Sequence, residues 1–66
     1  MDRETEILEF IKGYMEEHGW APVIREIGEG VGITSTSHVS YYLDKLEEHG
    51  KIERQSNSAR AIRVLA

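Results

Sequence analysis

Apolar positions between residues 4 and 18 recur at the spacing of one helical face, whereas most charged side chains lie elsewhere. The residues that share this face are Ile7, Leu8, Ile11, Tyr14 and Met15. Asp2 is a suitable N-cap, and Gly19 is a suitable residue to end the helix. The pattern predicts a first amphipathic helix over residues 4–18.

A short second helix is predicted to begin at Val23 or Ile24 and to end at Gly32. The residues that keep helical spacing in this segment are Ile24, Ile27 and Val31. This spacing favours a helix over the alternative of a flexible glycine-rich loop. Gly28 costs roughly 1 kcal/mol relative to alanine inside a helix, so its presence on the inner face indicates that another helix approaches closely.

The strongest periodic segment follows the polar turn that contains Thr34. Its core-facing residues, at i, i+4 and i+7, are Val39, Leu43 and Leu46. Ser35 is placed to cap this third helix, and Gly50 is placed to end it as a C′ glycine.

Alternation of polar and apolar residues then predicts two strands, 51–54 and 60–65, joined by a polar turn over 55–59. An isolated hairpin is marginal in water, so Ile52, Ile62 and Val64 are expected to pack on the helices. The expected fold class is mainly α with a small β-hairpin, in a single domain that spans residues 1–66.

Charge is distributed unevenly along a chain whose formal net charge is −4. Residues 1–30 carry three basic and eight acidic side chains, whereas residues 51–66 carry four basic and one acidic. Phosphate binding depends on lysine and arginine, so the net charge opposes nucleic-acid binding and the basic hairpin favours it.

Composition excludes several classes of protein. The chain has no cysteine, which excludes disulfides and cysteine zinc sites, and its three histidines lack metal-ligand spacing. A core built from 66 residues has little room for a catalytic pocket of roughly 300–1,000 Å³. The sequence also lacks a long apolar run, and its N-terminus is charged. We expect a cytoplasmic protein that is not an enzyme, with no metal, cofactor, small-molecule substrate or membrane partner.

The outer face of the third helix holds the candidate chemistry. Its first half presents Ser37 and Tyr41, flanked by His38 and Ser40, whereas its second half is acidic. Small hydrogen-bonding groups at a helix N-terminus suit base edges in the major groove. The plainer alternatives are solvated capping residues on the helix and a solvated basic strand pair in the hairpin.

Three segments of the chain closely resemble the DNA-binding domain of the LexA-like SOS-response transcriptional repressors. They are Ile24-Arg25-Glu26-Ile27-Gly28, Val31-Gly32-Ile33-Thr34-Ser35-Thr36-Ser37-His38-Val39 and Arg60-Ala61-Ile62. The resemblance covers nearly the whole chain. It implies a three-helix winged helix-turn-helix domain whose third helix binds one half-site of a double-stranded DNA operator.

The resemblance also implies which residues contact bases, whereas the phosphate contacts of the hairpin are expected from its basic charge. The residues expected to contact bases are Ser35, Ser37, His38, Ser40 and Tyr41. The residues expected to contact phosphate are Arg25, Thr34, Thr36, Arg54, Arg60 and Arg63. By analogy, Ser35 also caps the helix and touches phosphate, Ser37 and Ser40 bond to base edges, and Tyr41 contacts a thymine methyl group or a sugar.

The chain departs from the family pattern at several positions. Val23 replaces the usual serine or threonine cap of the second helix, and the hairpin lacks the prolines of relatives. His38, Ser40 and Tyr41 also differ, which leaves the operator sequence open. The family's self-cleaving domain would lie beyond Ala66, so no catalytic residue is carried over. We expect a monomer that becomes a dimer on a two-half-site operator when joined to a C-terminal dimerisation domain.

A winged helix can instead bind another protein without binding DNA. The acidic first helix and the net charge of −4 are the features that favour this alternative. It predicts that the third helix or Trp20 is buried against a protein, and that salt has little effect on binding.

Overall fold

The computed structural model describes residues 1–55 and 60–66. Its elements, in chain order, are α1 (Arg3–His18), α2 (Ile24–Val31), α3 (Thr36–Glu48), β1 (Ile52–Arg54) and β2 (Ile62–Val64). This order confirms the prediction of three helices followed by a hairpin. Residues 56–59, which hold most of the predicted turn, lie outside the described residues.

Both strands are shorter than the sequence predicted. They pair antiparallel through Ile52–Val64, Glu53–Arg63 and Arg54–Ile62. Lys51 was predicted to begin the first strand, but its N–H bonds instead to the carbonyl oxygen of Leu46 at 2.9 Å and closes the end of α3. The carbonyl oxygen of Lys51 still accepts the Leu65 N–H at 2.8 Å, so hydrogen bonds between the two segments continue beyond the strands at this end.

Predicted caps set the helix boundaries. Asp2 accepts a hydrogen bond from the Thr5 N–H at 2.7 Å at the start of α1, and Ser35 accepts one from the His38 N–H at 3.4 Å at the start of α3. Gly50 follows α3 with a φ of 73°, and its N–H bonds to the carbonyl oxygen of Glu47 at 3.0 Å. Together with the Lys51 bond, this forms a Schellman motif, as expected for a C′ glycine.

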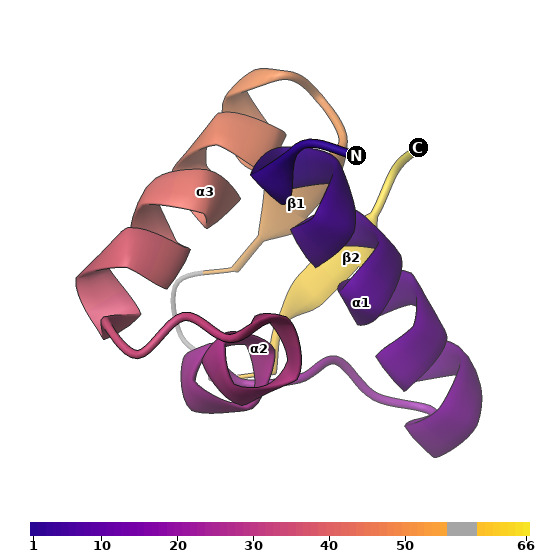
Figure 1. The fold of residues 1–66 in the computed structure, drawn as a ribbon. Coiled ribbons are helices and arrows are strands. Elements are labelled where there is room, and N and C mark those ends of the chain that lie inside the picture. Colours follow the sequence, from indigo (N-terminus) through magenta and orange to yellow (C-terminus); the bar gives the residue numbers. More distant parts are fainter. Residues whose placement is uncertain (56–59) are drawn as a thin grey trace.

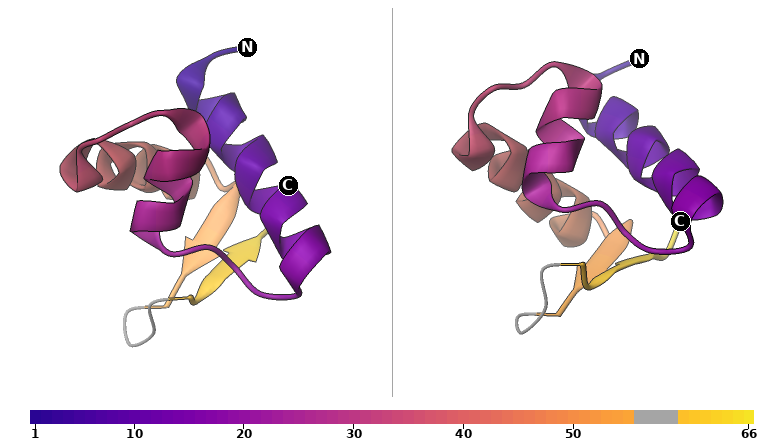
Figure 2. Two further views of the ribbon diagram at one scale, coloured as in Figure 1. Left: turned by 60° about the horizontal axis from the view of Figure 1, so that its bottom comes forward. Right: turned by 90° about the horizontal axis from the view of Figure 1, so that it is seen from below.

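One hydrophobic core joins all three helices to β1. Its buried members are Ile7, Leu8, Ile11, Ile27, Val31, Ile33, Val39, Leu43, Leu46 and Ile52. Ile62 and Val64 pack against it from β2, as predicted. Figure 1 shows α1 and α3 on opposite sides of α2, and the views of Figure 2 show the hairpin along one side of the helices. No helix within the described ranges is long and apolar enough to cross a membrane.

A close backbone contact lies between α2 and α3. Gly28 is buried, and a Cβ atom there would lie 2.6 Å from the carbonyl oxygen of Ile33 and 3.5 Å from Cγ2 of Val39. The predicted close approach therefore exists, but its nearest partner is the backbone of the turn rather than another helix. Gly32 supplies the left-handed conformation of this turn, with a φ of 77°. The two glycines together let the chain turn directly from α2 toward α3.

We predict that Gly28→Ala lowers the free energy of unfolding by about 1–3 kcal/mol, because the new methyl group must displace the Ile33 backbone. Gly13→Ala is the matched control, since no heavy atom lies within 4 Å of its Cβ position. That change should instead raise the free energy of unfolding by about 0.5–1 kcal/mol. Urea unfolding of both variants measures the difference, and equal effects at the two positions would contradict the steric argument.

Candidate nucleic-acid interface

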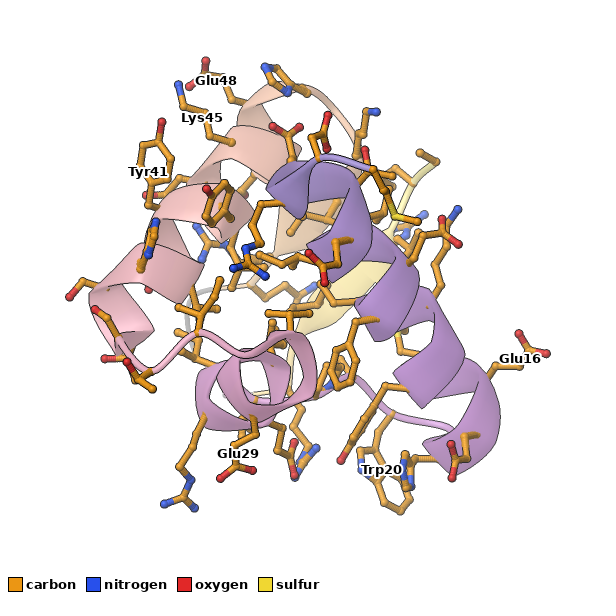
Figure 3. The ribbon with its side chains drawn as sticks, viewed as in Figure 1. Glu16, Trp20, Glu29, Tyr41, Lys45 and Glu48 are labelled. Carbon is orange, nitrogen blue, oxygen red and sulfur yellow. The ribbon has the colours of Figure 1, made fainter. Side chains whose placement is uncertain are left out.

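The five residues predicted to contact bases lie together on the cap and first two turns of α3. Ser40 is half-buried, and the other four are exposed: Ser35, Ser37, His38 and Tyr41. Figure 3 shows Tyr41 projecting from the outer side of this helix, with Lys45 and Glu48 beyond it. The structure therefore presents an uncharged hydrogen-bonding surface at the N-terminal half of α3 and charged side chains at its C-terminal half.

Aromatic side chains make up part of this surface. The Tyr41 side chain is about half exposed, at 52%, and the Nζ atom of Lys45 lies 5.6 Å from its ring centroid. The Tyr41 and Tyr42 rings meet edge to face, with their centroids 5.3 Å apart, and the centroid of the His38 ring lies 5.2 Å from that of Tyr42. These contacts hold the Tyr41 ring on the outer face. Sequence analysis missed Lys45 as its neighbour, although the i+4 spacing from Tyr41 indicates this contact.

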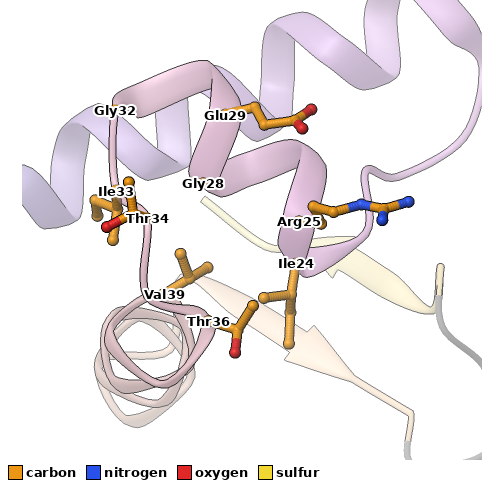
Figure 4. Close-up of a pocket in the computed structure, with 9 residues that line it drawn as sticks. All are labelled: Ile24, Arg25, Gly28, Glu29, Gly32, Ile33, Thr34, Thr36 and Val39. Atoms are coloured by element: carbon orange, nitrogen blue, oxygen red, sulfur yellow. The ribbon is translucent and has the colours of Figure 1, made fainter.

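An open groove of about 460 Å³ runs between α2 and the start of α3 (Figure 4). Three of the residues predicted to contact phosphate, Arg25, Thr34 and Thr36, are among those that line it. Figure 4 shows Arg25 extending outward from α2, whereas Ile24 and Thr36 face each other across the groove. The structure thus places these three polar residues beside the N-terminal end of α3, where the helix dipole is positive.

Arg25 differs from the other arginines in its surroundings. Its side chain is exposed, and it is the one arginine without an ion pair within residues 1–55 and 60–66. Arg63 is also mostly exposed, and its 3.7 Å contact with Glu53 lies on the surface of the hairpin. Surface pairs of this kind stabilise weakly, so Arg25 and Arg63 are the arginines most available to an anionic partner.

Arg60 is held by two segments of its own chain. It donates to the carbonyl oxygen of Ala21 at 2.8 Å and to both carboxylate oxygens of Glu26, at 3.1 and 3.3 Å. Glu26 also accepts the Val23 N–H at 2.8 Å, which is the half of a capping box that needs no oxygen on the Val23 side chain. The Val23 N–H and then Arg60 lower the pKa of Glu26 below its ordinary value. One carboxylate therefore joins the start of α2 to the hairpin.

Arg54 is held in the same way by α3. Its guanidinium donates to Asp44 through Nη2 and to Glu47 through Nε at 3.1 Å. Burial by itself lowers the pKa of Arg54, but these hydrogen bonds outweigh it and raise that pKa. Two of the three hairpin arginines predicted to contact phosphate are thus hydrogen-bonded to carboxylates of α2 and α3, whereas Arg63 has only its exposed pair with Glu53. Sequence analysis treated the acidic helices and the basic hairpin separately and so missed these pairs.

We predict that Glu26→Gln lowers the unfolding temperature at pH 7, because it removes the charge that Arg60 and the Val23 N–H stabilise. A lowered carboxylate pKa contributes stability above the ordinary value of 4.5, and this contribution is lost as the pH falls through the folded-state pKa. The difference between parent and variant should therefore shrink below pH 4.5.

Thermal unfolding across the acid range measures this effect. Glu16→Gln is its control, since Glu16 is an exposed α1 carboxylate that has no ion pair among the described residues. A constant difference between parent and Glu26→Gln at every pH would contradict the assignment.

Comparison with known proteins supplies the family. Residues 1–61 match the family model described as the LexA DNA binding domain. The LexA repressor of Frankia alni is 47% identical over 64 residues, which are 97% of this chain and 25% of that protein. The LexA repressor of Clostridium novyi is 48% identical over 64 residues, covering 97% of this chain and 31% of that protein.

A third relative, the LexA repressor of Clostridium botulinum strain Hall, is 42% identical over 65 residues. Those residues are 98% of this chain and 32% of the relative. The chain thus spans between a quarter and a third of the length of the relatives it matches. With its three helices and antiparallel hairpin, the chain belongs to the LexA DNA-binding domain family and has its winged helix-turn-helix fold.

Proposed function

We propose that this domain binds double-stranded DNA sequence-specifically, as the DNA-binding part of a LexA-like transcriptional repressor. The observation that carries the proposal is the arrangement around α3. Its exposed N-terminal half bears hydroxyl and aromatic groups, and the groove beside it gathers Arg25, Thr34 and Thr36. In this fold the N-terminal end of the recognition helix enters the major groove, and the flanking residues bind the phosphate backbone. Family membership supports the same assignment.

We assign a DNA contact to each side chain from its position in the structure. Ser37 and Ser40 bond to base edges, Tyr41 contacts a thymine methyl group or a sugar, and Ser35 and His38 contact the bases nearest the helix start. Arg25, Thr34 and Thr36 bind phosphate on one side of α3. Arg63 binds it from the hairpin. Arg54 and Arg60 were predicted to do the same, but their carboxylate partners favour a role in positioning the wing.

The acidic residues of α1 do not oppose this assignment. Figure 3 places Glu16 and Trp20 at the end of the molecule far from Tyr41. Exposed charges separated by more than a Debye length, about 8 Å at physiological salt, are largely screened from each other. Glu16 therefore has little effect on the proposed interface, whereas Glu29 is an acidic side chain that lines the groove together with Arg25.

The remaining parts of the proposal concern the larger assembly. We propose that residues 1–66 form one domain that acts as a regulator rather than an enzyme and works in the cytoplasm, where a bacterial or phage operator lies. A single copy binds one half-site. Two copies bind a two-half-site operator as a dimer when a C-terminal dimerisation domain joins them. Family membership and the partial coverage of the LexA relatives support this arrangement.

Titration of labelled duplexes tests the proposal. The chain is expected to bind a palindromic SOS-type operator more tightly than a scrambled duplex of the same length, and to lose affinity as salt rises. Fluorescence anisotropy at two salt concentrations measures both effects. The absence of binding at low salt, even to a duplex with two half-sites, would contradict DNA binding and favour the protein-interaction alternative.

We predict that Ser37→Ala and Tyr41→Ala each reduce discrimination between the operator and a single-base variant by about 1–3 kcal/mol at the contacted base. Both side chains lie on the exposed outer face of α3, so neither change leaves a cavity in the core. Glu16→Ala serves as a control that leaves α3 intact, because Glu16 is exposed on α1 far from Tyr41. If both α3 variants kept the parent's discrimination, α3 would not be the element that recognises the base sequence.

A further inference from the structure

Arg54 lies at the end of β1 with its side chain turned toward α3. Only 28% of this side chain is exposed, against 76% for Arg63 on the neighbouring strand. Both of its hydrogen-bond partners, Asp44 and Glu47, belong to the second half of α3. Burial and two charged partners fix this guanidinium in one place.

Asp44 lies on the same face of α3 as the proposed base contacts. It follows Tyr41 by three residues and Ser40 by four, so the three side chains are neighbours on the helix surface. Its side chain is 67% exposed. In the proposed docking, with the N-terminal half of α3 in the major groove, this carboxylate lies on the helix face turned toward DNA and its phosphate backbone. Without a positive partner it would repel that backbone.

From this geometry we propose that Arg54 is a positioning residue which neutralises the acidic half of α3 and holds the wing against it. This inference rests on the proposed DNA-binding function. Arg54 does not itself bind phosphate in this arrangement. To reach a phosphate it would have to break its hydrogen bonds to both carboxylates and leave them unpaired beside DNA. The wing and the recognition helix therefore bind DNA as one unit.

The alternative role makes a different prediction about salt. An arginine that binds phosphate releases about one counterion, so its removal makes the plot of log affinity against log salt shallower by about 0.9. Arg25 is the matched comparison, because it is exposed and has no ion pair within the described part of the chain. We expect Arg25→Gln to reduce the slope in this way. Arg54→Gln should weaken binding about tenfold, and the slope should return to the parent's once Asp44 and Glu47 are also neutralised, whereas loss of a phosphate contact keeps the slope shallower.

The decisive experiment is a mutant cycle on the 66-residue chain. Anisotropy titrations with a two-half-site operator duplex compare the parent, Arg54→Gln, Asp44→Asn with Glu47→Gln, and the combination of all three changes. If Arg54 neutralises the two carboxylates, their removal strengthens binding at least about fivefold more when Arg54 is absent than when it is present. An equal gain in both backgrounds, or a salt slope of the variant with all three changes that stays about 0.9 shallower than the parent's, overturns the inference.

Two controls separate this outcome from others. Glu48→Gln removes a carboxylate of the same helix that pairs with Lys45, at 3.9 Å, and not with Arg54. Glu48→Gln should change the affinity by the same factor whether Arg54 is present or absent. If its effect depended on Arg54 as strongly as the effect of removing Asp44 and Glu47, the inference would be overturned. Arg54→Met replaces Arg54→Gln if the latter unfolds, because methionine keeps a long apolar side chain against α3 and also removes the charge.

The parent titration distinguishes the two proposals. If the parent does not prefer the operator to a scrambled duplex, the proposed sequence-specific DNA binding and the proposed role of Arg54 are both wrong. If the parent does prefer the operator, but the effects of the substitutions on the binding free energy simply add, only the proposed role of Arg54 is wrong.

Discussion

The contact between Gly28 and the carbonyl oxygen of Ile33 determines where α3 lies. A side chain larger than hydrogen would collide at 2.6 Å, so the turn after α2 passes over this position only because the residue is glycine. This turn also places Cγ2 of Val39 3.5 Å from the Cβ position at Gly28, and so sets the start of α3 beside α2. The groove that holds Arg25 and the exposed face that bears Tyr41 follow from that placement. A steric constraint in the core thus decides which polar groups meet at the surface.

A second level of organisation comes from charge. The acidic side chains that make the net charge negative do more than oppose DNA. Glu26 caps α2 and binds Arg60, and Asp44 and Glu47 bind Arg54, so three carboxylates anchor the two ends of the hairpin loop to both helices of the helix-turn-helix unit. A two-stranded hairpin has little stability of its own. Its orientation depends on these pairs and on the packing of Ile52 against the core.

The sequence was sufficient to predict the elements and their caps because both depend on neighbours within a few residues. Asp2, Ser35 and Gly50 act where the periodic patterns begin and end. The candidate base contacts were found for the same reason, since they share one face of one helix. The pair between Glu26 and Arg60 joins residues 34 apart in the chain, and no local pattern specifies it. The two residues do occur in separate motifs of the LexA resemblance, and the structure shows that these motifs meet.

Local charge counts are therefore a poor guide to which arginines bind DNA. Arg54, Arg60 and Arg63 were all predicted to contact phosphate because the hairpin is basic, yet the first two donate hydrogen bonds to carboxylates of α3 and α2, and only 28% of the Arg54 side chain is exposed. An arginine bound bidentately or by two carboxylates gives up several charge-assisted hydrogen bonds when it moves to a phosphate, and the exchange gains little net free energy. An arginine without such partners gains the phosphate contact at no comparable cost. Exposure and existing partners, rather than charge alone, make Arg25 and Arg63 the stronger candidates for binding the backbone.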